Sequence, residues 1–274
     1  MTTISMPAPG GIPLLGLGTY PLMGEDAFRA VRMAIDLGIR HIDTAQMYGN
    51  EREIGRAVAA SGLPRGDVFV VTKVDPGNVG ASRFAASVAR SMEDLGGPAD
   101  LLLIHWPPAE DDFDAALDRL MAERAKGNAR AIGVSNFSPA MMRRAQHRCG
   151  GALVNNQVEF HPLLDQKAVL ATARELGLVL SAYSPLARGA ALKPAAIAAI
   201  ASRLGRPTSE VVLRWIMQQG VVAIPMTTKR ENALSNIATL SLELSAEDMA
   251  AISALGTRQG RTINPSWMAG RWEP

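Results

Sequence analysis

The sequence predicts an α/β fold, a closed (β/α)8 barrel of the TIM type. Three observations predict it. Eight short apolar runs recur along the 274 residues, and longer amphipathic stretches separate them. Within the runs, apolar side chains stand at consecutive positions, which is typical of strands buried on both faces of a parallel sheet. Because barrels of this kind commonly reach roughly 250 residues around one sheet, we expect a single domain over residues 1–274.

The eight apolar runs mark the expected strands. The third and fourth are the clearest, with Phe69-Val70-Val71 in one and Leu101-Leu102-Leu103-Ile104 in the other. In chain order, the expected strands are residues 16–19, 41–45, 68–74, 101–106, 131–135, 154–159, 179–184 and 221–225.

Glycines and one serine mark the ends of the expected helices. Gly38, Gly96 and Gly127 each follow an amphipathic stretch, where glycine accepts the left-handed backbone of a C-cap. Ser138 is an expected N-cap, with Pro139 at the first helical position. The expected helices are residues 26–37, 81–95, 113–126, one starting at 139, and two more at 195–204 and 209–218.

Two additions to the simple barrel are expected. The two helices at 195–204 and 209–218 both lie between the last two strands, so one of them is an extra helix. Residues 4–15, with Gly10-Gly11 at their centre, predict an N-terminal β-hairpin that closes the bottom of the barrel.

Composition narrows the class of partner. The 28 basic and 26 acidic residues leave a net charge of only +2, which does not favour nucleic acid or an acidic membrane surface. A small molecule is the expected partner. The single cysteine, Cys149, forms no internal disulfide and suits a reducing compartment. The apolar runs are too short to span a bilayer and the N-terminus does not resemble a signal peptide, so we expect a cytoplasmic protein.

Three familiar motifs are incomplete. Residues 16–21 begin like a dinucleotide fingerprint, but Pro21 occupies the position of the third glycine, which disfavours a Rossmann fold. Residues 133–137 resemble a nucleophile elbow but end in Phe137, which disfavours a serine hydrolase. No two of the four histidines stand at metal-ligand spacing, so no metal site is expected.

Four polar residues carry the expected chemistry, because each lies where a predicted strand ends: Asp43, Tyr48, Lys73 and His105. A free phenol has a pKa of about 10, too high for a good acid at neutral pH. An ammonium beside Tyr48 favours the phenolate, so we expect Lys73 to lower that pKa and Asp43 to hold Lys73 charged. Tyr48 is then the expected proton donor to a carbonyl oxygen, and the protein an oxidoreductase.

Five ordered motifs around these residues resemble one known family. They are residues 38–51, 71–73, 103–107, 132–137 and 155–162, and together they resemble the aldo-keto reductase superfamily from about Gly16 to the C-terminus. The short loops and residues 228–232 resemble the bacterial 2,5-diketo-D-gluconic acid reductases. The resemblance implies reduction of small aldehydes and ketones, such as 2,5-diketo-D-gluconate or methylglyoxal, by hydride from NADPH. It also implies a monomer.

The resemblance assigns roles residue by residue. His105 orients the substrate carbonyl, while Tyr20 and Trp106 contact the substrate, and the tail from Trp267 is expected to line the same pocket. Ser135, Asn136 and Gln157 hold the nicotinamide carboxamide, and Tyr183 stacks on its ring. The remaining expected cofactor contacts are Ser184, Leu186, Ile224, Thr227, Thr228, Lys229, Arg230 and Asn236.

One departure from the family concerns the adenosine 2′-phosphate. Met226 and Asn232 stand where the family has a lysine and an arginine. Lys229 and Arg230, at the start of an expected helix, can replace those charges. NADPH therefore remains the expected cofactor, with NADH allowed and discrimination weaker.

Other interpretations of the same residues stay open. An Asp–Lys pair is often only structural, Ser135 and Asn136 can cap a helix, and Met226 can be a buried gap-filler. Lys73 can form a Schiff base in a cofactor-free lyase or isomerase. A non-catalytic, regulatory barrel that only binds the nicotinamide cofactor is a further alternative.

Overall fold

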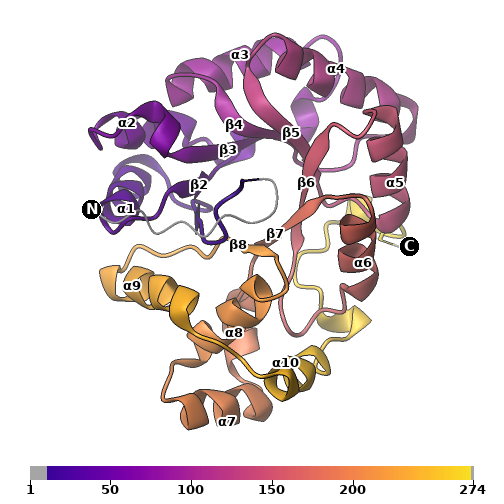
Figure 1. Ribbon diagram of the computed structural model, residues 1–274. Helices are drawn as coiled ribbons and strands as arrows, with labels where there is room; N and C mark the ends of the chain where they lie inside the picture. The colour runs from indigo at the N-terminus through magenta and orange to yellow at the C-terminus, as the bar shows by residue number, and fades with distance from the viewer. Residues whose placement is uncertain (1–10, 273–274) are drawn as a thin grey trace.

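A single parallel sheet of eight strands forms the centre of the computed structural model, which describes residues 11–272. Each strand pairs with the next one in the chain, from β1 to β8 (Figure 1). The strands are β1 (Leu17–Gly18), β2 (His41–Asp43), β3 (Phe69–Val74), β4 (Ala99–Ile104), β5 (Ala129–Ser135), β6 (Leu153–Glu159), β7 (Val179–Tyr183) and β8 (Val222–Ala223). All eight overlap the apolar runs of the sequence.

The last strand meets the first, which curls the sheet into the expected (β/α)8 arrangement. Leu15 and Ala223 form a parallel bridge. The amide of Gly16 donates to the carbonyl of Ala223 at 2.9 Å, and that of Gly18 donates to Pro225 at 3.1 Å. There is no room for a side chain at either glycine. A Cβ added to Gly16 would lie 2.8 Å from the His41 ring, and one added to Gly18 would lie 2.8 Å from the carbonyl oxygen of Ile224.

Helices cover the outside of this sheet (Figure 1). They are α1 (Gly24–Asp36), α2 (Glu51–Ala59), α3 (Phe84–Leu95), α4 (Phe113–Ala125), α5 (Pro139–Arg148), α6 (Lys167–Glu175), α7 (Ala195–Leu204), α8 (Thr208–Met217), α9 (Arg230–Ala238) and α10 (Ala246–Ser253). Two of them, α7 and α8, lie between β7 and β8. The predicted hairpin over residues 4–15 falls mostly outside the described residues.

Local signals in the sequence explain several helix boundaries. Gly96 takes a left-handed conformation after α3, with φ at 75°, and Gly38 and Gly127 also have positive φ. Ser138 caps α5 by accepting a hydrogen bond from the amide of Met141. The expected helix over 81–95 starts later, at Phe84, because the chain turns from Gly80 to Arg83 first.

Buried apolar side chains form three clusters. The largest lies between the sheet and the helices and includes Leu102, Leu120 and Trp215. A second packs α1 and α2 on the first strands and includes Val31 and Ile54. The smallest lies inside the barrel, as barrel geometry requires, and includes Val71, Leu101 and Val222. Because the barrel interior is packed, polar groups at the strand ends are held on a rigid base.

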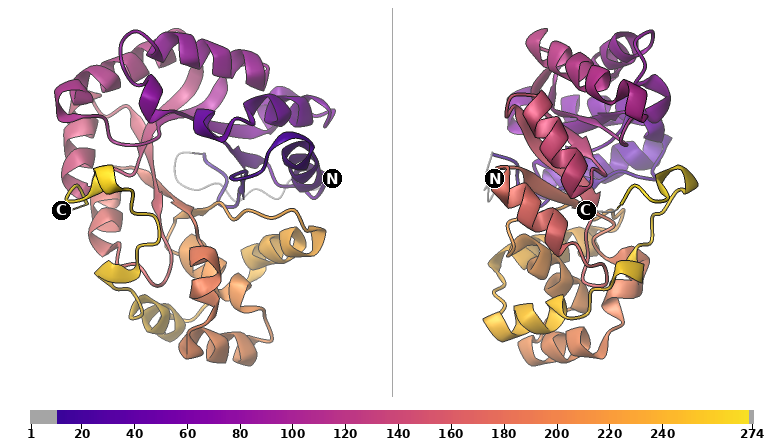
Figure 2. Two further views of the ribbon diagram at one scale, coloured as in Figure 1. Left: turned by 180° about the vertical axis from the view of Figure 1, so that it is seen from behind. Right: turned by 90° about the vertical axis from the view of Figure 1, so that its right-hand side faces the viewer.

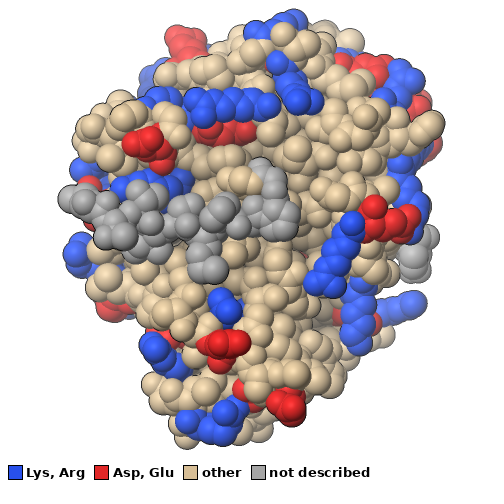
Figure 3. All heavy atoms as spheres, viewed as in Figure 1, with Lys and Arg blue, Asp and Glu red and all other residues tan. Residues whose placement is uncertain are grey.

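The segment after α10 leaves the layer of helices. Figure 2 shows that it protrudes on the side of the molecule that faces away from the viewer in Figure 1. It contains two short 3-10 turns, at Arg258–Gly260 and Ser266–Met268. On the face shown in Figure 3, basic and acidic side chains are interspersed, with no large area of one sign. None of the helices within residues 11–272 has the length and apolarity needed to cross a membrane.

Candidate active site

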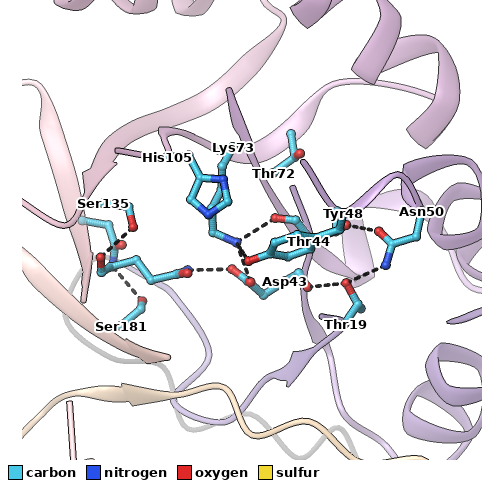
Figure 4. Close-up of polar contacts among 12 residues, drawn as sticks. Thr19, Asp43, Thr44, Tyr48, Asn50, Thr72, Lys73, His105, Ser135 and Ser181 are labelled. Atoms are coloured by element: carbon cyan, nitrogen blue, oxygen red, sulfur yellow. Dashed lines mark hydrogen bonds and ion pairs between the residues drawn. The ribbon is translucent and has the colours of Figure 1, made fainter. Parts of the chain in front are cut away.

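The four polar residues expected at strand ends lie together at one end of the barrel (Figure 4). Lys73 is fully buried, and its Nζ donates to Asp43 Oδ1 at 2.6 Å and to the carbonyl oxygen of Thr44 at 2.8 Å. The same Nζ lies 3.4 Å from the Tyr48 hydroxyl. The rings of His105 and Tyr48 have centroids 5.7 Å apart. An ammonium, a carboxylate, a phenol and an imidazole are therefore close enough to act on one small molecule.

A short turn after β2 presents Tyr48. The turn Gln46–Tyr48 ends at Gly49, whose φ of 64° suits a residue without a Cβ. Asn50 holds the turn from behind, because its side chain accepts from Thr44 Oγ1 at 2.5 Å and donates to the carbonyl of Leu22 at 2.8 Å. These contacts fix the direction of the phenol.

The protonation states of Lys73 and Tyr48 follow from burial and from each other. Burial lowers the pKa of Lys73, but Asp43 and Tyr48 raise it, and the net pKa lies above the ordinary value. Burial raises the pKa of Tyr48, Lys73 opposes this, and the net pKa is also raised. Lys73 thus has the expected effect of lowering the pKa of Tyr48, but the expectation that the net pKa falls below the ordinary value is wrong, because burial destabilises the phenolate more than the ammonium stabilises it.

His105 is a neutral imidazole at physiological pH. Burial and then the charge of Lys73 place its pKa well below the usual value. Its Nδ1 is buried without a hydrogen-bond partner among the described residues. Trp106 stacks beside it, with ring centroids 6.3 Å apart and planes 21° from parallel.

The residues expected to hold the nicotinamide form one connected polar network beside the tetrad. Gln157 Nε2 donates to the second carboxylate oxygen of Asp43 at 2.6 Å, and the Ser135 hydroxyl donates to the backbone carbonyl of Gln157 at 2.8 Å. Asn136 donates to the carbonyl of His105 at 3.0 Å and accepts from the Tyr183 hydroxyl at 2.7 Å. Ser135 and Asn136 do not cap α5, because Ser138 does.

The segment after β7 carries the next expected contacts. Ser184 and Leu186 are half-buried, and Ser184 has a φ of 47°. Ala187 and Arg188 also have positive φ, at 48° and 53°. Because non-glycine residues rarely adopt this backbone, the chain is held there against a local cost.

The segment after β8 carries the remaining ones. Ile224, Thr227 and Asn236 are buried, whereas Thr228, Lys229 and Arg230 are exposed. Thr227 Oγ1 accepts from the amide of Lys229 at 3.1 Å, just before α9 begins.

Two positions depart from the family here. Met226 is 45% exposed, so its interpretation as a buried gap-filler is wrong. Asn232 is also exposed, one turn into α9. Neither position carries a charge, and the exposed Lys229 and Arg230 are the cations at this end of the helix.

Aromatic rings surround the entrance to the tetrad. Tyr20 is 59% exposed and its ring centroid lies 5.1 Å from that of Tyr48. Trp106 contacts two tryptophans of the C-terminal segment edge-on, with centroids 6.1 Å from Trp267 and 6.2 Å from Trp272. The expected substrate-binding residues are thus brought to the same opening as the tetrad.

Two parts of the site were not foreseen. Behind Tyr48, the Thr19 hydroxyl accepts from Asn50 Nδ2 at 3.3 Å and donates to the carbonyl of Asp43 at 2.9 Å, and no local signal marks these long-range contacts. Glu159, at the end of β6, has no exposed surface and accepts hydrogen bonds from the C-terminal segment. One signal in the sequence could have identified Glu159: a carboxylate stands at the end of a strand that is expected to be buried, and buried carboxylates are normally paired.

A cavity of about 470 Å³ lies between α2 and α3, and its lining includes Gln46 and Gly49 but no residue of the tetrad. Glu51 reaches it and is hydrogen-bonded to Thr72 at 2.5 Å and to Ser91 at 3.0 Å. Burial raises the pKa of Glu51. These bonds join α2, α3 and β3, so we assign Glu51 to the scaffold. Within residues 11–272, no group of His, Cys, Asp or Glu side chains is arranged to hold a metal ion.

Comparison with known proteins agrees with this geometry. The model of the aldo/keto reductase family matches residues 14–257. The chain is 37% identical to the methylglyoxal reductase DkgB of Escherichia coli O157:H7, over 96% of this chain and 99% of that protein. It is 39% identical to an aldo-keto reductase of Mycolicibacterium smegmatis, over 93% and 92% of the two chains.

Solved structures give the same result. One that is provisionally assigned as a 2,5-diketo-D-gluconic acid reductase B superposes with a TM-score of 0.95 at 38% identity, covering 99% of both chains. An aldo-keto reductase of the silkworm Bombyx mori in complex with NADP superposes with a TM-score of 0.88 at 28% identity, covering 97% of both. The family model and these relatives extend over nearly the whole chain, and from them we conclude that it belongs to the aldo/keto reductase family of oxidoreductases.

Proposed function

We propose that this protein reduces small aldehydes and ketones to alcohols with NADPH, and that Tyr48 is the general acid. The observation that carries the proposal is the position of Lys73 Nζ, 2.6 Å from Asp43 and 3.4 Å from the Tyr48 hydroxyl. A phenol next to a fixed ammonium can lose its proton to a carbonyl oxygen, because the ammonium stabilises the phenolate that forms.

Each residue of the tetrad has one role in this proposal. Neutral His105 donates a hydrogen bond to the substrate carbonyl and orients it. Tyr48 transfers its proton to the carbonyl oxygen as the carbonyl carbon accepts hydride. Lys73 stabilises the tyrosinate, and Asp43 keeps Lys73 charged and in place. The tyrosinate then regains a proton from solvent.

The residues at the carboxyl ends of β5, β6 and β7 fit a nicotinamide dinucleotide. Ser135, Asn136 and Gln157 offer polar groups for a carboxamide, and Tyr183 offers a flat ring for stacking. Gln157 also touches Asp43, which brings this group of residues against the tetrad. When bound, the reduced nicotinamide supplies the hydride. Ser184 and Leu186 are proposed to contact the pyrophosphate.

The substrate class is proposed from the relatives and from the entrance. The relatives include proteins named for methylglyoxal and for 2,5-diketo-D-gluconic acid. Tyr20 and Trp106 form an aromatic entrance, which suits small carbonyl compounds with a flat or apolar part. We further propose that the chain acts as one domain and as a monomer in the cytoplasm.

The fixed state of Lys73 argues against a Schiff-base lyase or isomerase. Its Nζ has hydrogen bonds to Asp43, the Thr44 carbonyl and Tyr48, and its pKa is raised. An amine must be unprotonated to attack a carbonyl, and this one is held as the cation.

The proposal is tested by replacing Tyr48 with phenylalanine. Tyr48→Phe removes only the hydroxyl, so we expect kcat to fall by at least about a hundredfold, the lower end of a general acid's contribution. NADPH affinity should stay nearly unchanged. The measurements are the loss of nicotinamide absorbance with methylglyoxal and other carbonyls, and an NADPH titration.

Two outcomes would contradict the assignment. Near-normal turnover by Tyr48→Phe would remove Tyr48 from the role of acid. Wild-type protein that binds NADPH but reduces no carbonyl in a broad panel would favour the regulatory alternative.

The preference for NADPH over NADH is proposed to depend on Lys229 and Arg230. Replacing both with alanine should lower kcat/KM with NADPH by about tenfold or more, because two exposed cations near a phosphate are each worth about a kcal/mol. The value with NADH should change little. Arg124→Ala, at an exposed position in the last turn of α4, provides a control for the loss of one surface charge. If the double variant had the same ratio of kcat/KM with NADPH to kcat/KM with NADH as wild type, the assignment would be refuted.

A further inference from the structure

The C-terminal segment is attached to the barrel before it reaches the entrance. Thr257 pairs with the loop after β6, since its amide donates to the carbonyl of Leu163 at 3.0 Å and its carbonyl accepts from the amide of Asp165 at 3.1 Å. Gly260 packs tightly on the same loop, where an added Cβ would lie 1.8 Å from the Leu163 carbonyl oxygen. Residues 257–260 are thus placed by backbone contacts.

From residue 261 onward, one buried side chain takes over from these backbone contacts. Glu159 ends β6, two residues after Gln157, and accepts hydrogen bonds from the amide of Thr262 at 2.8 Å and the amide of Ile263 at 3.1 Å. The Thr262 hydroxyl also donates to it, and His161 Nε2 lies 3.0 Å away. Burial raises the pKa of Glu159, but the hydrogen bonds from His161 and Thr262 outweigh burial, and the net pKa is lowered.

The same carboxylate is connected to the tryptophans at the entrance. Arg261 NH1 lies 3.8 Å from Glu159 Oε2, and the Arg261 guanidinium lies 3.7 Å from the centroid of the Trp272 ring. Trp272 contacts Trp106, which stacks on His105. A continuous series of contacts therefore runs from the end of β6 to the catalytic histidine's neighbour.

The far end of the segment has its own attachment, at the two prolines that follow Trp106. Arg271 donates to the carbonyls of Pro107 and Pro108, at 3.2 Å and 2.6 Å. Trp267 lies between the two attachments and Trp272 directly follows the second, and both contact Trp106. Only the attachment at Glu159 uses a fully buried charge.

We propose that Glu159 is a positioning residue for substrate binding: its carboxylate fixes residues 261–263 so that Trp267 and Trp272 meet Trp106 and complete the substrate pocket. The inference rests on the proposed function and extends it. Glu159 touches neither the tetrad nor the tail tryptophans directly, so it acts through Thr262, Ile263 and Arg261. Removing its charge should weaken binding of aromatic carbonyls without weakening binding of NADPH.

The test replaces Glu159 with glutamine. Glu159→Gln keeps the size of the side chain but replaces one carboxylate oxygen with an NH2 group. That group faces the N–H and O–H donors of Thr262 and Ile263, so charge-assisted hydrogen bonds are lost and the attachment is destabilised. We expect KM for benzaldehyde to rise about tenfold, with kcat changed by less than about threefold. KM for methylglyoxal, which has no aromatic ring to pack on the tail tryptophans, should rise less. The dissociation constant of NADPH should stay within about twofold.

A measurement independent of activity accompanies the kinetics. Amide hydrogen exchange of residues 261–272 should be about tenfold faster in Glu159→Gln than in wild type, because the segment opens more often. Glu175→Gln, the same substitution at a partly exposed glutamate on α6, is the matched control and should change neither exchange nor KM. Thr262→Val, which removes one donor from an exposed residue and keeps the buried charge, should give the same pattern at about a third of the size.

The outcomes separate this inference from the proposed function. If wild type reduces no carbonyl, the proposed function fails, while hydrogen exchange still tests the attachment. If wild type is active and Glu159→Gln leaves KM for benzaldehyde unchanged, the inference is overturned. A rise in the NADPH dissociation constant equal to the rise in KM also overturns it. If Glu159→Gln does not fold, Thr262→Val decides, and an unchanged KM in that variant refutes the inference.

Discussion

Lys73 illustrates how a buried charge is kept in a barrel. Its side chain has no exposed surface, and its ammonium is stabilised by a carboxylate, a backbone carbonyl and a phenol. Removing one partner from a buried pair leaves an uncompensated charge, which typically costs about 3–5 kcal/mol. The same arrangement that keeps Lys73 charged places that charge beside Tyr48.

The pH dependence of reduction follows from the shifts at Tyr48 and His105. The proton donor must be protonated, and because the pKa of Tyr48 is raised, the loss of kcat/KM should begin only in strongly alkaline solution. His105 must be neutral, and because its pKa is far below the usual value, kcat/KM should not fall as pH decreases from 8 to 6. The measurement is kcat/KM for a neutral aldehyde across this range and into the alkaline region.

A decline in kcat/KM centred near the ordinary histidine value of about 6.5 would contradict the placement of His105 in a buried site. A decline near neutral pH on the alkaline side would contradict the raised pKa of Tyr48. His105→Gln, which cannot titrate, separates the two, since it should leave the alkaline limb in place.

For single residues, the sequence indicated which side chains form the site, but it indicated their burial and pKa less well. The order of Asp43, Tyr48, Lys73 and His105 at strand ends predicted which side chains meet. The sign of the pKa shift at Tyr48 was wrong, because the balance of burial against one ammonium depends on how much water the phenol retains. The alternative interpretation of Met226 as a buried gap-filler was also wrong, because the exposure of this side chain depends on the path of the chain between β8 and α9.

Gly55 sets the distance between α2 and α3. A Cβ at this position would lie 2.2 Å from the backbone carbonyl oxygen of Asp94, and backbone cannot move aside as a flexible side chain can. We therefore expect Gly55→Ala to lower the free energy of unfolding by about 1–3 kcal/mol despite the better helix propensity of alanine. Urea denaturation monitored by circular dichroism measures the change.

Gly80→Ala is the matched control for Gly55→Ala. Gly80 is exposed, no atom lies within 4 Å of an added Cβ, and its φ is not in the left-handed region. Its substitution should change the free energy of unfolding by less than about half a kcal/mol. Equal losses in the two variants would mean that the close approach of α2 to α3 is not what limits position 55.

Element boundaries were predictable where the chain carries a stop signal. The expected helix over 195–204 coincides with α7, because Pro194 precedes it and Gly205, with φ at 61°, follows it. The first and last strands are only two residues long, shorter than their apolar runs. The paths of the C-terminal segment and of the turn before Tyr48 were not predictable, since both depend on partners far away in the chain.

For the whole molecule, the proposed cofactor would bridge the ends of β5, β6, β7 and β8. A ligand that binds only the folded chain stabilises all of it, by about 2.7 kcal/mol at a concentration one hundred times its dissociation constant. For a chain of this size we expect NADPH to raise Tm by roughly 5–10 °C at that concentration. Differential scanning fluorimetry with NADPH, and with NADH at equal concentration, measures it.

The difference between the Tm shifts with NADPH and with NADH tests the proposed phosphate contacts. NADH should give the smaller shift, because it lacks the phosphate that Lys229 and Arg230 are proposed to bind. Absence of any shift with either cofactor would contradict cofactor binding at these strand ends. The barrel architecture itself was predictable from the eight apolar runs, whereas the position of the tail over the entrance was not, because no periodicity in the sequence records it.

The seam between Leu15–Gly18 and Ala223–Pro225 has a consequence for how the chain is made. During synthesis, the earliest strand leaves the ribosome long before its second neighbour exists. Its open edge therefore stays available to other chains until residue 225 has emerged, and a truncated product that stops earlier would expose that edge permanently.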